Sequence, residues 1–311
     1  MGDQQGEVRA TSASWAVRLA HWTQRGQAAP VRDDHLAGRV PVEGALVESG
    51  PEQHHVARAG GGAGGIRQLE LRQIVAVWSA AALPMAVLAW LVAPALAGRL
   101  GGEGGVPLAK ALFVALTVGL VWQGVLVAIL VGREQRSLRW SVVREALWLG
   151  PPRSPSSGQT GGRVWLILVP LIVGFATVQL LVPTLPSPDS RDLGALLSGD
   201  VGQRFFQDNW GWFALTVVMA AFNTMLGEEL LFRGFLLPRM SGVFGRGDWV
   251  ANGVLFAVYH LHVPWVIPVA LLDAVFLAYP TKRFRSAWMG IAVHSSQSLF
   301  VIALTLPLVL R

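Results

Sequence analysis

The sequence predicts an all-α membrane protein, built as a polytopic transmembrane bundle of about seven helices. Of its 311 residues, 52% are hydrophobic and only 14% are charged. The hydrophobic residues are gathered into long runs, and a helix needs about 20 apolar residues to cross a bilayer. This composition is typical of integral, multi-pass membrane proteins and not of soluble domains.

The beginning of the chain differs from the rest. Residues 1–70 are polar, carry acids and arginines in near balance, and include a glycine-rich run at 60–65. Such a segment cannot bury enough apolar surface to offset the entropy of ordering it. We therefore expect a disordered cytoplasmic tail at 1–70, a first group of transmembrane helices at 71–200 and a second group at 201–311.

Apolar stretches in the remainder predict the spanning helices. In chain order they are 74–97, 108–132, 164–184, 210–237, 249–262, 264–280 and 286–310. The fifth and sixth are short for a bilayer. Between the second and third, residues 137–148 have apolar side chains at helical spacing among arginines, which predicts a helix along the cytoplasmic surface.

The charges of the loops predict the orientation. Connections 133–163 and 281–285 carry an excess of arginine and lysine, as cytoplasmic loops do, whereas connection 185–209 lacks it. All three agree on an N-terminus inside and a C-terminus outside. We expect a protein of the cell (plasma) membrane with a cytoplasmic N-terminus.

The composition also excludes several kinds of partner and site. The chain has no cysteine, which removes disulfides, thiolate nucleophiles and cysteine-ligated zinc. Its basic excess lies in loops and forms no patch interleaved with aromatic residues, so we expect no nucleic-acid partner. The expected surroundings are the lipid bilayer.

Ionisable side chains within apolar stretches are the strongest functional signal. Glu228, Glu229 and Arg233 lie in the fourth stretch, and His260 and His294 lie in two later ones. A charged side chain at the bilayer centre costs about 2.5–3.5 kcal/mol even on the mildest insertion scale. Residues retained at that cost usually serve a function.

Helical spacing separates the two glutamates. Glu229 and Arg233 are four residues apart and share a helix face, so they can form an ion pair. Glu228 is rotated from Glu229 by about 100° and is left free for chemistry. The alternative is that both acids only neutralise the arginine near a helix end.

Glu228, His260 and His294 reach similar depths in the membrane. At a rise of about 1.5 Å per residue, each lies roughly 14–16 Å from the cytoplasmic end of its helix. A glutamate in such a site can act as a general base toward water, while histidines orient the water or donate to an oxyanion. These groups are sufficient to hydrolyse an amide.

Motifs around these residues resemble those of the CAAX prenyl endopeptidase and bacteriocin-processing intramembrane protease family. In the family's order and on separate apolar stretches, they are Glu228-Glu229-x-x-x-Arg233, Phe256-x-x-x-His260 and His294-x-x-x-Ser298. The resemblance covers residues from about Trp210 to Leu306. It implies that residues 201–311 form a CAAX-protease-like catalytic transmembrane core.

The resemblance implies a role for each of these residues. Glu228 would be the catalytic base and His260 the histidine that orients the water. His294 would stabilise the oxyanion, and Glu229 and Arg233 would support the site. Phe256 is expected only to pack one turn before His260.

Ser298 departs from the family pattern, which usually has asparagine at this position. It lies four residues after His294 on the same helix face, and its hydroxyl is a shorter donor than a carboxamide. Loss of one oxyanion donor can cost about 2.7–4 kcal/mol in the barrier. We expect Ser298 to preserve part of that function, or a water to fill the gap.

We therefore expect an intramembrane endopeptidase that cleaves a peptide or membrane-protein substrate without a cofactor. Zinc-dependent hydrolysis is an alternative, because Glu228, His260 and His294 could serve as three ligands for zinc. A transporter, whose ionisable residues line an ion path, and a non-catalytic membrane scaffold are alternatives from other classes.

Two further ionisable residues lie close to the motifs. Asp273 is in the short sixth stretch, where it could face the shared cavity, pair with a histidine or sit in a re-entrant segment. His262 is two residues after His260, on another helix face and near a span end. We expect His262 at the membrane interface.

Overall fold

The computed structural model of the chain describes residues 66–100, 105–188, 191 and 199–310. The chain divides into two compact units, Met1–Gly60 and Gly61–Arg311, and every described residue belongs to the second. The tail expected at 1–70 therefore lies outside the described residues, apart from its last five. The expected division near residue 200 stays a prediction.

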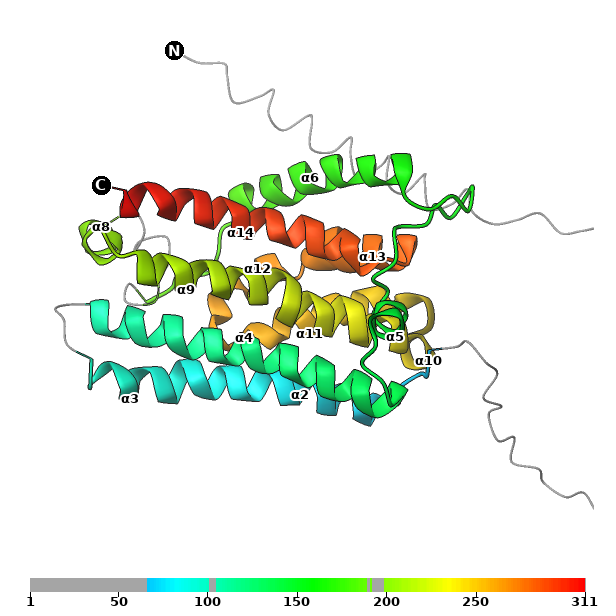
Figure 1. The fold of residues 1–311 in the computed structure, drawn as a ribbon, viewed down its shortest axis with the longest axis horizontal. Helices are drawn as coiled ribbons and strands as arrows, with labels where there is room; N and C mark the ends of the chain where they lie inside the picture. Colours follow the sequence, from blue (N-terminus) through cyan, green and yellow to red (C-terminus); the bar gives the residue numbers. More distant parts are fainter. Residues whose placement is uncertain (1–65, 101–104, 189–190, 192–198, 311) are drawn as a thin grey trace, which may run out of the picture. The chain divides into compact units, whose positions relative to one another are not determined.

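The described part of the chain is helical and contains no strand (Figure 1). Within it, five helical runs are long and apolar enough to cross a membrane. They are Leu71–Ala97 (α2, η2 and α3), Val106–Gln135 (α4), Gly162–Leu181 (η3 and α6), Trp210–Arg239 (α9 followed by η5, η6 and η7) and Ala287–Val309 (α14). The all-α membrane class is thus confirmed.

The expected count of seven spans is not confirmed, because the described residues give five, or six if one bent pair is a single span. That pair is Pro264–Ala270 and Ala274–Phe284, which meet at an angle of 51°. The fifth expected span is instead α11, Asp248–Tyr259, a helix of 12 residues. Twelve residues cover about 18 Å, well short of a hydrocarbon core about 30 Å thick.

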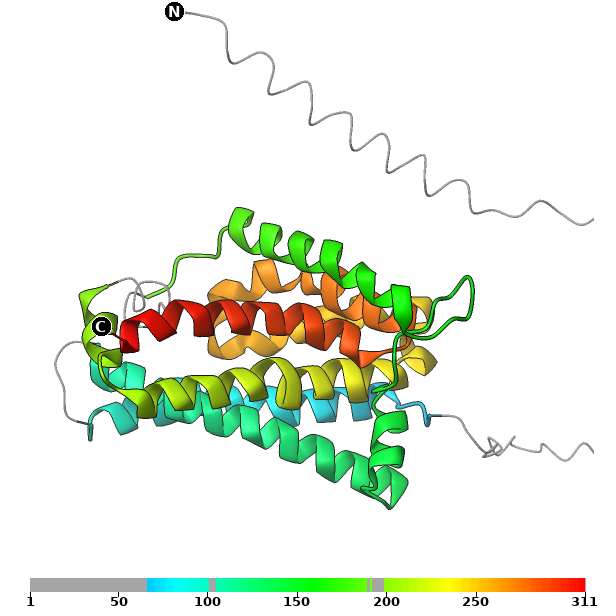
Figure 2. The ribbon, with the colours of Figure 1, turned by 45° about the horizontal axis from the view of Figure 1, so that its top comes forward.

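The long helices pack side by side. Figures 1 and 2 show α14 flanked by α9 on one side and α6 on the other, and all of these pairs are in contact. On the other side of α9, α4 packs against the fourth span, α2 and α3. The short α11 packs against η11 (Ala274–Ala278), the π-helical beginning of the second half of the bent pair.

A shared apolar core holds these helices together. It contains buried side chains from most of the described helices, including Met85 of α2, Leu120 of α4, Phe175 of α6, Phe232 of η6, Phe256 of α11 and Val293 of α14. Burial of a large side chain of this kind contributes about 1.5–3 kcal/mol in water. In a bilayer, close packing of the same groups supplies the attraction between helices.

A buried arginine joins three elements at the end of the fourth span. The Arg239 guanidinium donates to both carboxylate oxygens of Glu134 on α4, with Nε–Oε2 and Nη2–Oε1 distances of 2.8 and 3.2 Å. Its Nη1 donates to the carbonyls of Ala146 and Phe235 at 3.0 and 2.9 Å. Two parallel bonds between arginine and carboxylate fix direction as well as distance.

Ala146 ends α5 (Trp140–Ala146), the helix expected along the surface at 137–148. Its Trp140 is 63% exposed, whereas Ala146 is buried in the core. Such a helix has one apolar face toward the bundle and an opposite face away from it, as the sequence predicts.

The fourth span is π-helical on both sides of the two glutamates. The segments are η5, Phe222–Gly227, and η6, Leu230–Leu236. A Cβ atom added at Gly227 would lie 2.6 Å from the Phe222 carbonyl oxygen and 2.9 Å from that of Leu120. Glycine therefore allows the span to approach α4 directly before Glu228. Short π-helical turns of this kind are frequent at functional sites.

Candidate active site

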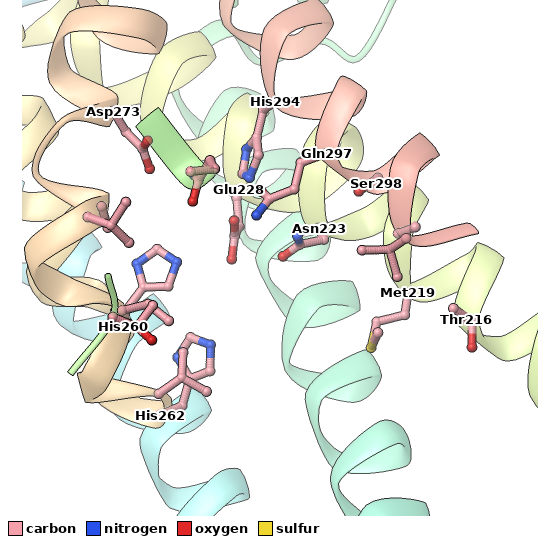
Figure 3. A pocket seen from close by; sticks show the side chains of 18 residues that line it. Thr216, Met219, Asn223, Glu228, His260, His262, Asp273, His294, Gln297 and Ser298 are labelled. Carbon is pink, nitrogen blue, oxygen red and sulfur yellow. The ribbon is translucent and has the colours of Figure 1, made fainter. Parts of the chain in front are cut away.

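A cavity of about 370 Å³ lies between the fourth span, α14, the turn after α11 and the bent pair (Figure 3). Glu228, His260, His294 and Ser298 all line it. Its other polar lining residues are Gln179, Thr184, Thr216, Asn223, His262, Asp273 and Gln297. The tertiary structure thus brings all four residues predicted to be catalytic to one cavity.

The adjacent glutamates have different surroundings. Glu228 is 1% exposed and lines the cavity, whereas Glu229 is fully buried beneath it. The Glu229 Oε1 atom lies 3.0 Å from Nη1 of Arg233, which is also fully buried. The ion pair predicted from their spacing of four residues is therefore confirmed, and so is the separation of Glu228 from it.

Glu229 also holds His294. The same Oε1 atom lies 3.0 Å from Nδ1 of His294, so one carboxylate joins the fourth span to α14. Because a carboxylate only accepts hydrogen bonds, Nδ1 is the donor. This contact fixes the ring and leaves Nε2 as the nitrogen available to the cavity. The sequence predicted the partner of Arg233 but not this second partner of Glu229.

Phe256 packs more extensively than predicted. The Arg233 guanidinium carbon lies 3.9 Å from the centre of its ring, a cation–π geometry. The ring also meets His260 and His294 edge to face, with centroids 4.8 and 5.9 Å away. Phe256 is therefore a shared wall for the arginine and both histidines, in addition to packing one turn before His260.

His260 begins the 3₁₀ turn that follows α11, His260–His262. Its Nδ1 lies 2.9 Å from the Phe256 carbonyl oxygen. A carbonyl only accepts, so Nδ1 is the protonated nitrogen, and in the neutral ring Nε2 is an acceptor. The ring is thus prepared to receive a hydrogen bond from a water.

The expectation that His262 lies on another face from His260 is wrong, whereas its place at the membrane interface stays a prediction. Its side chain is 8% exposed, lines the cavity and stacks on His260 with centroids 5.5 Å apart. The expectation assumed a continuous α-helix, but α11 ends at Tyr259 and the tighter 3₁₀ turn re-aims the residues after it.

Asp273 faces the cavity, as one of the three alternatives predicted. It is 6% exposed and lies at the break in the bent pair, directly before η11. Irregular backbone at membrane depth is tolerated where it lines a cavity, which explains why a carboxylate can occupy this bend. Within the described residues, Asp273 forms no ion pair.

Sequence reasoning missed Tyr259 and Gln123. Tyr259 is fully buried, and its hydroxyl accepts a hydrogen bond of 2.6 Å from Nε2 of Gln123 on α4. The same hydroxyl interacts with the Glu228 carboxylate. The available signal was a glutamine in the middle of an apolar stretch, because such a group needs a polar partner.

The residues proposed as zinc ligands line the same cavity, and the zinc-dependent alternative stays a prediction. Among the described residues, no group of three or more histidine, aspartate or glutamate side chains is placed to hold a metal ion. One potential ligand nitrogen, Nδ1 of His294, is also occupied by Glu229. The arrangement is better suited to positioning a water and a carbonyl by hydrogen bonds.

Gly290 lies directly against the buried Glu229 carboxylate, because it has no side chain to fill that space. A larger residue there tests whether the position of Glu229 matters for stability. A Cβ atom there would lie 2.5 Å from Oε2 of Glu229. We expect Gly290→Ala to displace the carboxylate and to lower the free energy of unfolding by about 1–3 kcal/mol, as overpacking typically does. Thermal unfolding in detergent measures this.

Gly150→Ala is the matched control, because a Cβ atom at Gly150 has no neighbour within 4 Å. Equal thermal unfolding midpoints for Gly290→Ala and Gly150→Ala would contradict the idea that Glu229 is held in one position.

Comparison with known proteins identifies the region that contains the motifs. A family model described as Type II CAAX prenyl endopeptidase Rce1-like matches residues 210–300. No curated protein and no solved structure matches the chain. The matched region runs from the start of the fourth span into α14 and contains the three motifs. The family suggests a CAAX-type intramembrane protease. The resemblance seen in the motifs is therefore confirmed, and residues 210–300 carry the pattern of the Rce1-like type II CAAX prenyl endopeptidase family.

Proposed function

We propose that this chain is a membrane-embedded endopeptidase that hydrolyses a peptide bond with a water activated by Glu228. One observation carries the proposal. Glu228, His260 and His294, which come from three separate elements, line the same cavity, while Glu229 is bound to Arg233 and His294. Glu228 is thus the glutamate at the cavity that no cation neutralises by direct contact.

The first step is addition of water to the substrate carbonyl. The Glu228 carboxylate removes one proton from the water as its oxygen bonds to the carbonyl carbon. Nε2 of His260 accepts the water's other hydrogen and so directs the attacking lone pair. The carbonyl oxygen becomes an oxyanion, and an N–H donor at the place where that charge develops lowers the barrier.

His294 is the donor. Its Nδ1 is bound to the Glu229 carboxylate, which stabilises a ring that carries a proton on both nitrogens. Nε2–H then donates to the oxyanion. In the second step the C–N bond breaks, the proton held by Glu228 passes to the leaving amine, and a carboxylic acid and an amine are the products.

The cavity walls favour a hydrophobic peptide segment as substrate. Aliphatic side chains of Val263, Val266, Val269, Ala270 and Val301 line the cavity beside the polar groups. We propose a peptide or membrane-protein substrate that reaches the site through the lipid bilayer. The apolar wall also limits access of bulk water, which strengthens the hydrogen bonds to the transition state.

Substitution of the proposed base and the water-orienting histidine tests this function. The protein is reconstituted in vesicles with a library of internally quenched peptides, and the best-cleaved peptide is used for kinetics. We expect Glu228→Gln and His260→Ala each to lower kcat by about 10²–10⁴-fold, the usual contribution of a positioned base or acid. Glu145→Gln, on the exposed side of α5, is the matched control. Wild-type turnover in both site variants would favour a non-catalytic scaffold or a transporter.

Removal of metal ions separates the proposal from its zinc-dependent alternative. We propose that no cofactor takes part, because proton transfer to Glu228, a hydrogen bond accepted by His260 and a hydrogen bond donated by His294 suffice for both steps. Dialysis of the reconstituted protein against a chelator should leave peptide cleavage unchanged. Loss of cleavage that added zinc restores would establish the metal-dependent mechanism instead.

We also propose that the N-terminus faces the cytoplasm of the cell and the C-terminus faces outside. The arginine-rich loop before α6 and the loop before α9, which lacks a basic excess, support this. Because the natural chain has no cysteine, single cysteines report the side of the membrane cleanly. In intact cells, an impermeant thiol reagent should label Gln207→Cys, and it should label Ser156→Cys only after permeabilisation. The reverse pattern would invert the proposed orientation.

A further inference from the structure

We propose that Asn223 is a catalytic residue that donates, together with His294, to the oxyanion, in the place of the asparagine that Ser298 replaces. This inference rests on the proposed function. It assigns to the fourth span a carboxamide that the motif at the end of α14 lacks.

The π-helical turn brings Asn223 to the same side of the span as Glu228. The two residues are five apart, and in an α-helix five residues turn through about 500°, which would leave them about 140° apart. Asn223 lies instead in η5, Phe222–Gly227, where bonds run from residue i to i+5, so residues five apart lie much closer to one face than in an α-helix. Both side chains accordingly line the cavity.

The Asn223 carboxamide is available for a substrate. Within the described residues it makes no hydrogen bond, whereas nearby hydroxyls are occupied: Thr224 donates to the Ala220 carbonyl and Ser296 to that of Val293. The side chain is only partly buried and lines the cavity, so its amide is open to a ligand there. Its position at the cavity makes a substrate oxygen the natural partner.

The other polar side chains near Asn223 in the cavity are less suited to donate to the oxyanion. Figure 3 shows the side chains of Asn223 and Gln297 between those of Glu228 and Ser298 in this view. Gln297 is exposed and has an additional side-chain torsion to order. Asn223 is shorter and is carried by the same helix as Glu228, so its distance from the base is set by the backbone.

The chemistry needs no further group. As the water oxygen bonds to the carbonyl carbon, the carbonyl oxygen gains negative charge and accepts two hydrogen bonds. One comes from Nε2–H of His294 on α14, and the other comes from Nδ2–H of Asn223 on the fourth span. No proton leaves the carboxamide, and both bonds weaken again when the C–N bond breaks and the carbonyl re-forms.

Cleavage kinetics of the reconstituted full-length protein test the assignment, with the quenched peptide selected above. We expect Asn223→Ala to lower kcat by about 10²–10³-fold with little change in KM, as loss of an oxyanion donor does. Gln207→Ala removes an exposed carboxamide outside the cavity and is the matched control, with kcat near wild type. Ser298→Ala should have a smaller effect than Asn223→Ala.

A rescue experiment separates catalysis from folding. Introducing Ser298→Asn into the Asn223→Ala variant returns a carboxamide to the end of the α14 motif. This should raise kcat by at least about tenfold, which is part of the loss that removal of an oxyanion donor causes. Wild-type kcat in Asn223→Ala, or an equal loss in Ser298→Ala, would overturn the inference. If Glu228→Gln still abolishes cleavage in that case, the proposed function stands and only the role of Asn223 fails.

Discussion

The structure depends on one buried carboxylate. Glu229 forms an ion pair with Arg233 and accepts a hydrogen bond from His294, at 3.0 Å each, with all three side chains buried. Separating two charges of a buried pair typically costs about 3–5 kcal/mol, because the remaining charge has no partner. The fourth span and α14 are therefore held in one relative position. The ring of Phe256, stacked on Arg233, brings α11 to the same centre.

The two adjacent glutamates therefore have different partners. Because Glu229 is paired with Arg233 and His294, Glu228 is left to face the cavity, where its carboxyl group interacts with the Tyr259 hydroxyl. Tyr259 is held in turn by Gln123 on α4, a helix outside the region that matches the family. The first half of the chain thus supports the site, although it contributes none of the three motifs.

Short and broken elements place the remaining polar groups. His260 and His262 lie on a 3₁₀ turn that ends a 12-residue helix, and Asp273 lies at a bend of 51° between two helical pieces. A continuous span would have carried these side chains around its circumference, some of them toward lipid. Ending the helices inside the bundle lets all three side chains line one cavity, where irregular backbone is tolerated at membrane depth.

Local periodicity was sufficient for the sequence to determine the helical class, the bounds of the long spans and the pairing of Glu229 with Arg233. Each follows from the length of an apolar run or from a spacing of four residues on one helix. The order of the three motifs likewise predicted which glutamate and histidines meet. Ser298 was identified from the same motifs as the position where this chain departs from the family.

Only the tertiary structure decided the length of α11, the burial of His262, the second partner of Glu229 and the places of Tyr259, Gln123 and Asn223. These features depend on where a helix stops, bends or widens into a π-turn. Such irregularities are set by close approach of neighbouring helices, as at Gly227 against α4, and not by the residues of one helix alone. A regular 3.6-residue period would have turned Asn223 away from Glu228, and packing between helices is what places the two side by side at the cavity.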